Sequence, residues 1–154
     1  MINPNEDGVT HVNIYSKGKT ELGRMLTNFA KFPIHTKEDG DFMSVEGYWY
    51  WLSIEDCKEK EILRKVYGFW AKKTGKELLE KYNKRFDENF ERKILSAIWY
   101  KFKRNADLLD EDIANLPFEH YYNYGGKVVD VKDKYQWMFD GIDKMRKKLL
   151  ESEE

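Results

Sequence analysis

The strongest pattern of apolar and polar positions in this chain repeats every four residues near its middle. Its apolar members are Phe86, Phe90, Ile94, Ile98 and Phe102. Residues at this spacing lie on one face of an α-helix, since a turn takes about 3.6 residues, so we predict a buried helix over 86–102. A similar pattern predicts an amphipathic C-terminal helix. Its apolar members are Tyr135, Met138, Phe139, Ile142, Met145 and Leu149.

Residues 45–82 are also expected to be helical. Ser44 is a suitable N-cap for a first helix with a buried face, whose members are Val45, Tyr48, Trp49 and Leu52. The pattern continues over 54–82, where the apolar residues are Ile62, Val66, Phe69, Trp70, Leu78 and Leu79. Gly68 and Gly75 are the expected breaks, because glycine weakens a helix interior. Two helices therefore fit residues 54–82 better than one.

Alternating and β-branched segments predict a small amount of β-structure. A first short strand is expected over residues 10–16. Two β-hairpins are expected, one around Asp39-Gly40 and one around Gly125-Gly126, because glycine supplies the backbone geometry of tight turns. Their strands are 33–36 with 41–43, and 118–124 with 127–131.

The remaining element is a short helix over 107–116, which Pro117 should end. Together these segments predict an α+β fold that is mainly α, with about six helices and small β-hairpins. The length of 154 residues suits one domain, and no repeat, low-complexity tract or linker divides the sequence. We therefore predict a single domain over residues 1–154.

Charge and composition narrow the functional classes. The 27 Lys and Arg residues nearly balance the 28 Asp and Glu residues, so the net charge of -1 provides no overall field that would attract nucleic acid. The single cysteine, Cys57, has no partner for an internal disulfide. Residues 1–8 are polar, and no apolar run approaches the ~20 residues of a membrane helix. We expect a soluble protein of the cytoplasm that binds no membrane.

Common motifs of catalysis and cofactor binding are absent from the sequence. It contains no phosphate-binding glycine loop, no nucleophile elbow and no cysteine-rich metal pattern. The histidines His11, His35 and His120 are scattered, without a partner at useful spacing. We predict neither a bound metal nor a cofactor.

Four consecutive aromatic residues, Tyr48 to Trp51, follow closely after the acid Glu46. Successive helical side chains point in different directions, so these rings cannot all enter one core. They either pack against several neighbouring elements or form a stacking platform for a base. Glu46 also has two interpretations. It is an ordinary first-turn acid at the helix N-terminus, or a carboxylate that activates water or stabilises positive charge beside a sugar.

An ordered set of five short motifs lies between residues 13 and 49. The motifs are Asn13-Ile14-Tyr15-Ser16, Leu26-Thr27-Asn28-Phe29, Pro33-Ile34, Asp39-Gly40 and Ser44-Val45-Glu46-Gly47-Tyr48-Trp49. Their order and spacing resemble the NADAR (YbiA-like) family. The segment 97–105, with Lys101-Phe102 and Asn105, resembles a later helix of that family. The resemblance covers most of the chain and is strongest before residue 52.

This resemblance implies a mainly helical YbiA-like domain that acts on the N-glycosidic bond of ADP-ribose or a related ribosyl phosphate. It implies that Glu46 is the catalytic residue and that Asn28 and Phe29 contact the nucleotide. Tyr48 and Trp49 would form walls of the pocket.

The chain departs from the family pattern at three places. The family commonly has a lysine seven residues after the glutamate, where this chain has Ser53, and Lys101 is the candidate substitute. The histidine that follows the family's glutamate is Gly47 here. The family's C-terminal Asp-x-x-Trp-Gly signature is matched only loosely, by Asp130 or Asp133 followed by Trp137. Of the two acids we take Asp130 as the second catalytic candidate, and Trp137 as a ligand contact.

The leading hypothesis is an N-glycosidase that removes ADP-ribose from a modified nucleobase, with guanine in DNA or a nucleotide as the expected base. The alternative is a non-catalytic protein that binds or sequesters ADP-ribose or a related signalling nucleotide, which Ser53 favours. A third hypothesis, a structural or protein-binding domain, predicts no nucleotide affinity. The lysine and aromatic content is similar to that of small proteins of large phages, in which case the cytoplasm would be that of a host. The sequence leaves the oligomeric state open.

Overall fold

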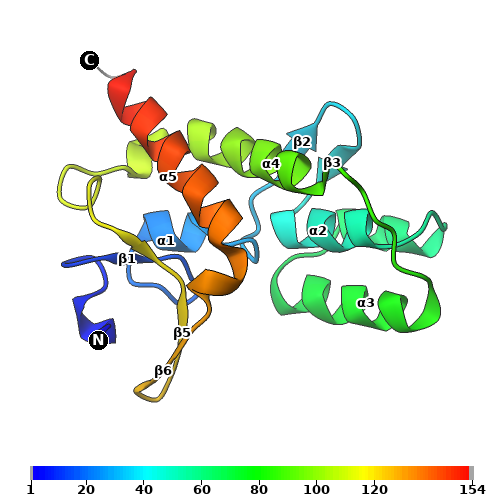
Figure 1. Cartoon of the computed structure of the whole chain (residues 1–154), viewed down its shortest axis with the longest axis horizontal. Coiled ribbons are helices and arrows are strands. Elements are labelled where there is room, and N and C mark those ends of the chain that lie inside the picture. Colours follow the sequence, from blue (N-terminus) through cyan, green and yellow to red (C-terminus); the bar gives the residue numbers. More distant parts are fainter. Residues whose placement is uncertain (1, 153–154) are drawn as a thin grey trace. The chain divides into compact units, whose positions relative to one another are not determined.

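The computed structural model describes residues 2–152 (Figure 1). Its α-helices are α1 (Glu21–Leu26), α2 (Val45–Ser53), α3 (Gly68–Lys81), α4 (Phe90–Arg104) and α5 (Gln136–Glu151). Short 3-10 helices are η1 (Pro4–Glu6), η2 (Glu59–Arg64), η3 (Ala106–Leu108) and η4 (Lys132–Tyr135). The strands are β1 (Val12–Asn13), β2 (Ile34–Thr36), β3 (Gly40–Phe42), β4 (Phe118–Glu119), β5 (Tyr121–Tyr124) and β6 (Lys127–Asp130). The predicted α+β, mainly α class is confirmed.

The chain forms two compact units. The central unit is Asn28–Lys101, and the terminal unit combines the residues up to Thr27 with those from Phe102 onward. The prediction of one domain over 1–154 stays a prediction. Within the part of the chain that the structure describes, no helix has the length and apolar character needed to cross a membrane.

The terminal unit contains two small sheets. Strand β1 pairs with β4 in parallel, and β5 pairs with β6 in the antiparallel hairpin predicted around Gly125-Gly126. The Asn13 side chain joins these sheets, because its Nδ2 donates to the Tyr121 carbonyl and its Oδ1 accepts from the Tyr121 amide, each at 3.0 Å. The predicted strand over 10–16 is much shorter than expected, since β1 contains two residues.

The C-terminal helix is confirmed as α5, with Met138, Phe139, Ile142 and Leu149 buried. The predicted helix over 107–116 is wrong, because this segment contains only η3 followed by turns. Asp110 explains the difference. Its side chain accepts a hydrogen bond from the Asp112 amide at 3.2 Å, and such local bonds compete with helix formation.

In the central unit, α2 is the helix around which the other elements pack. Ser44 caps it as predicted, with its hydroxyl accepting a hydrogen bond from the Gly47 amide at 3.0 Å. The predicted hairpin around Asp39-Gly40 is confirmed as antiparallel β2 and β3. Helix α2 contacts β3, η2 and α3. Figure 1 shows α2 and α3 running side by side.

The four consecutive aromatic residues of α2 together contact four different elements. Tyr48 stacks on Phe42 of β3 at a centroid distance of 4.6 Å, and Trp49 meets the Phe90 ring of α4 edge-on at 4.8 Å. Tyr50 lies against Gly75 of α3, while the Trp51 indole donates to Glu61 of η2 at 2.6 Å. These contacts support the packing interpretation of the aromatic run.

Helix α4 confirms most of the four-residue pattern, since Ile94, Ile98 and Phe102 are completely buried. Phe86 was wrongly included, because it lies outside the helix and 92% of its surface is exposed. The reason is Asp87, whose Oδ1 accepts from the Asn89 amide at 2.8 Å and forms a turn just before the helix begins at Phe90.

The two predicted glycine breaks have different outcomes. Gly68 begins α3 with a φ of 58°, which a glycine adopts easily, so this break is confirmed. The break at Gly75 is wrong, because this residue lies inside α3, where a Cβ atom would overlap the Tyr50 ring. Gly75 therefore serves close helix packing rather than termination.

Three apolar residues predicted for the core are on the surface instead. Ile62, Phe69 and Trp70 are exposed, whereas Val66 and Leu78 from the same predicted pattern are buried. The pattern was misread because η2 is a 3-10 helix and α3 starts only at Gly68, so the two segments do not share one helical phase.

Candidate functional site

Glu46 lies in the first turn of α2. The loop at Asn28 and Phe29 is hydrogen-bonded to the starts of both α2 and α3. The Glu46 amide donates to the Asn28 carbonyl at 2.9 Å, and the Gly68 amide at the start of α3 donates to the Phe29 carbonyl at 2.8 Å. Because both bonds use the backbone, they fix the position of the loop irrespective of its side chains. The structure thus brings together Glu46, Asn28 and Phe29, which the sequence had grouped.

Gly47 shows why the histidine of the family pattern is missing here. A Cβ atom at position 47 would overlap the carbonyl oxygen of Leu63 in η2, which is a backbone atom that cannot rotate away. Ser44 holds the same region together, since its hydroxyl donates to the Val66 carbonyl at 2.9 Å. The backbone of η2 thus occupies the space that a side chain at position 47 would need.

The Glu46 carboxyl and the lysines Lys72 and Lys76 of α3, whose charges act on it, are together called the recess. Glu46 as a whole is partly exposed, but its carboxyl is desolvated by burial, which raises the pKa of this group from 4.5 to about 7. The positive charges of Lys72 and Lys76 oppose this effect and favour the ionised form. At neutral pH the carboxyl group is consequently present in both protonation states.

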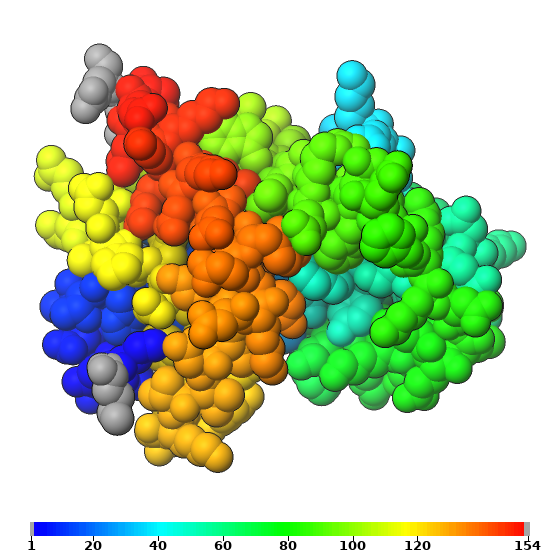
Figure 2. Space-filling view, in the orientation of Figure 1, coloured from blue at the N-terminus to red at the C-terminus, as the bar shows by residue number. Residues whose placement is uncertain are grey.

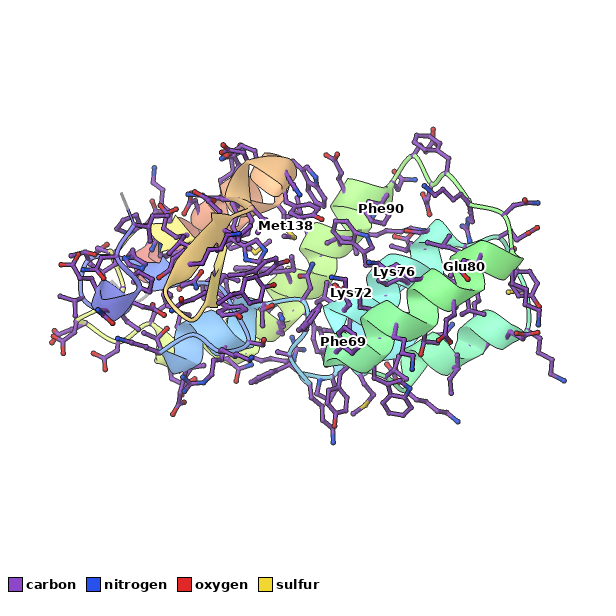
Figure 3. All side chains as sticks on the ribbon, turned by 90° about the horizontal axis from the view of Figure 1, so that it is seen from below. Phe69, Lys72, Lys76, Glu80, Phe90 and Met138 are labelled. Atoms are coloured by element: carbon purple, nitrogen blue, oxygen red, sulfur yellow. The ribbon has the colours of Figure 1, made fainter. Side chains whose placement is uncertain are left out.

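Lys72 and Lys76 belong to the candidate site, and the sequence analysis missed them. They are one turn apart on α3, and Figure 3 shows them following Phe69 along the helix, with Glu80 one turn further on. The signal in the sequence is weak, because lysines spaced four apart are typical of any solvated helix face. Only the packing of α3 against α2 reveals that their charges act on Glu46.

The surface of the central unit is hollowed over α2, between α3 and the beginning of α4. Figure 2 shows atoms of α2, coloured turquoise, at the bottom of a hollow between the green surfaces of α3 and the beginning of α4. Trp49 is half-buried and lies on the same side of α2 as Glu46, three residues further along the helix. Its edge-on contact with Phe90 orients the indole ring there.

Tyr48 has a different environment from Trp49. Only 1% of its surface is exposed, and its hydroxyl donates to Asp39 at 2.7 Å. Asp39 in turn forms an ion pair with Lys93 at 3.4 Å. Tyr48 therefore connects α2 to the β2–β3 hairpin, and its predicted role as a pocket wall has no support from its exposure.

Ser53 stands where the family pattern has a lysine, and its hydroxyl donates to the Trp49 carbonyl at 2.7 Å. Lys101, the candidate substitute, is a buried residue of α4, and burial lowers its pKa to about 7. A lysine with such a pKa is partly neutral at physiological pH.

Asp130 and Trp137 belong to the terminal unit. Asp130 is exposed at the end of β6, and its Oδ1 accepts from the Lys132 amide at 3.0 Å, which stabilises the turn that follows the hairpin. Trp137 is half-buried in the first turn of α5. The catalytic role of Asp130 and the ligand contact of Trp137 stay predictions.

Among residues 2–152, no group of three or more His, Cys, Asp or Glu side chains is arranged to hold a metal ion. The charged groups of the recess are instead one carboxyl and two ammonium groups. Ammonium groups bind phosphate oxygens, and a carboxyl with a pKa near neutrality can accept or donate a proton. The recess is therefore chemically suited to a phosphorylated ligand that carries a bond to be hydrolysed.

Comparison with known proteins identifies a protein of similar fold. The fold is similar to that of the E. coli protein YbiA, determined by NMR, with a TM-score of 0.62, 21% sequence identity and coverage of 99% of this chain and 95% of that chain. No family model and no curated protein sequence matches the chain. The YbiA-like fold expected from the sequence motifs is thereby confirmed.

Proposed function

We propose that the protein is an N-glycosidase that removes ADP-ribose from a modified nucleobase, with guanine as the base. The observation that carries this proposal is the pKa of Glu46, which burial of its carboxyl beside Lys72 and Lys76 raises to about 7. Such a group is suited to proton transfer near neutral pH. The YbiA-like fold and the motifs around Glu46 support the choice of ADP-ribose as the substrate.

In the proposed reaction, the bond between the anomeric carbon of the ribose and the base nitrogen breaks, and its electron pair goes to the base. The sugar passes through a transition state with oxocarbenium character, which a nearby carboxylate stabilises. Water then attacks the anomeric carbon, and Glu46 in its ionised form accepts the proton of this water. The products are free ADP-ribose and the unmodified base, which takes up a proton.

Lys72 and Lys76 have a separate role in this proposal, the binding of the diphosphate. Their ammonium groups lie close enough to influence the Glu46 carboxyl, and phosphate oxygens would accept hydrogen bonds from them. The half-exposed Trp49 ring would cover one face of the ligand. The loop at Asn28 and Phe29 would bound the recess at the starts of α2 and α3.

The second candidate function is non-catalytic binding of ADP-ribose or a related nucleotide. Ser53 favours it, because this residue replaces the lysine of the family pattern and its hydroxyl is bonded to the backbone of its own helix. A protein of this kind would keep the diphosphate site formed by Lys72 and Lys76 and release no product.

The test is incubation of the protein with an oligonucleotide and with a guanosine nucleotide that both carry ADP-ribose on guanine, followed by mass spectrometry of released ADP-ribose. We expect release by the wild type, a rate that rises with pH through about 7 as Glu46 ionises, and a loss of at least about 100-fold in E46Q. The matched control is E77Q, which changes an exposed acid of α3.

Three outcomes are informative. Unchanged release by E46Q would refute the catalytic role of Glu46. Tight binding of ADP-ribose without release would favour the second candidate function. The absence of both binding and release would leave the hypothesis of a structural or protein-binding domain.

A further inference from the structure

The beginning of α3 carries a cluster of exposed aromatic residues that the proposed reaction does not use. The exposed fractions are 40% for Tyr67, 71% for Phe69 and 54% for Trp70. The Tyr67 and Trp70 rings form an edge-on pair with a centroid distance of 6.4 Å. Exposure of three large rings within four residues costs solubility without contributing to the core, so it indicates a binding surface.

Positive charge surrounds this cluster. The segment 65–76 contains four lysines and no acidic residue, and the lysines are Lys65, Lys72, Lys73 and Lys76. Lys31 adds a fifth charge, since its Nζ lies 5.4 Å from the centre of the Tyr67 ring. The first turn of α3 also lacks an acid that would neutralise the positive end of the helix dipole. The overall charge of -1 hides this local basic surface.

The cluster is continuous with the candidate site. Phe69, Lys72 and Lys76 are spaced three and four residues apart, so they follow one another along one face of α3, as Figure 3 shows. The distance along the helix axis from Phe69 to Lys76 is only about 10 Å. A chain-like ligand that lies on Phe69 is therefore followed along α3 by Lys72 and Lys76, whose charges act on Glu46.

We propose that Tyr67, Phe69 and Trp70, together with Lys31, Lys65 and Lys73, form a platform that binds single-stranded nucleic acid. Aromatic faces stack with bases of any sequence, and interspersed lysines bind the phosphates between them. An acidic protein partner would use the lysines but would gain little from three exposed rings. The inference rests on the proposed function in one respect, because it makes the natural substrate a nucleic-acid strand rather than a free nucleotide.

The experiment measures the affinity of the protein for an unmodified fluorescent DNA strand by anisotropy, so that its result does not depend on catalysis. Stacking of one base on an aromatic ring accounts for a factor of at least about five in affinity. We therefore expect W70A and F69A each to weaken binding by at least about fivefold. The matched control is F86A, which removes an aromatic side chain that is 92% exposed and lies outside this cluster.

A second variant tests the charges. K73Q should reduce the slope of log affinity against log salt concentration by about 0.7, the contribution of one phosphate contact on a single strand. Circular dichroism checks that each variant is folded.

Two outcomes would overturn the proposal. One is binding of the DNA strand by W70A and F69A with the same affinity as F86A. The other is equal competition by polyglutamate, which would show that only charge matters. Release of ADP-ribose from the modified guanosine nucleotide is measured separately, so an active enzyme that does not bind DNA would refute the platform and leave the proposed function intact. Binding of DNA without any release of ADP-ribose would refute the proposed N-glycosidase activity and leave the platform intact.

Discussion

The central unit contains two clusters of aromatic residues with opposite environments. In α2, Tyr48 to Trp51 contact four different elements, and Trp51 is 9% exposed. At the start of α3, Tyr67, Phe69 and Trp70 have similar chemistry but remain on the surface. The hydrophobic effect acts equally on both clusters. The difference is that neighbouring elements surround α2, whereas one side of α3 has no covering element within this unit.

This comparison shows that aromatic content alone does not identify a ligand site. The rings of α2, which look like a stacking platform in the sequence, mainly hold the unit together. The rings of α3, which look like part of a helical core, are the ones available to a partner. Within α2, Glu46 and Trp49 remain accessible, so stability and the candidate chemistry share one helix.

The largest expected effect is the difference between two tryptophan substitutions. W51A should lower the free energy of unfolding by about 3–5 kcal/mol, because it removes a buried ring that packs on Phe42 and lies 4.0 Å from the Lys60 ammonium. W70A should change stability by no more than about 0.5 kcal/mol, since its ring is exposed. Urea denaturation at neutral pH measures both. Similar losses of stability in W51A and W70A would contradict the difference between the buried rings of α2 and the exposed rings of α3.

Ionisation of Glu46 should make the folded protein less stable as the pH rises. Its pKa is 4.5 in the unfolded chain and about 7 in the folded protein, so the folded state holds the proton more tightly. The resulting loss in the free energy of unfolding is therefore absent below pH 4.5, grows between pH 4.5 and pH 7, and is complete above pH 7. Each pKa unit corresponds to about 1.4 kcal/mol.

The variant E46Q should consequently be more stable than the wild type by at most about 3 kcal/mol at pH 8 and equally stable at pH 4. Parallel urea denaturation at the two pH values measures this, with E77Q as the control at an exposed acid of α3. A gain in stability that is the same at both pH values would argue that the carboxyl does not lie in a desolvating recess.

The smallest effect concerns the contact between α2 and α3. G75A should destabilise the protein by about 1–3 kcal/mol, because the added Cβ overlaps the Tyr50 ring. In the double variant Y50A/G75A the loss should be clearly smaller than the sum of the two single losses, since the overlap disappears. Thermal denaturation of the four proteins tests this. Additive losses would mean that Gly75 and Tyr50 do not restrict each other.

The sequence by itself determined the elements whose signals are local. The Ser44 cap, the turn at Asp39-Gly40 and the hairpin around Gly125-Gly126 were all predicted, because side-chain capping and glycine turns depend on neighbouring residues. The buried face of α4 was predicted from its spacing for the same reason. The motifs around Glu46 also indicated the YbiA-like fold correctly.

Only the tertiary structure decided which residues share an environment. The roles of Gly47 and Gly75 depend on atoms far along the chain, namely the Leu63 carbonyl and the Tyr50 ring. The recess of Glu46 exists because α3 packs against α2 and brings Lys72 and Lys76 near the carboxyl. Burial and pKa arise from such long-range packing, and a pattern of residues along one segment does not contain this information.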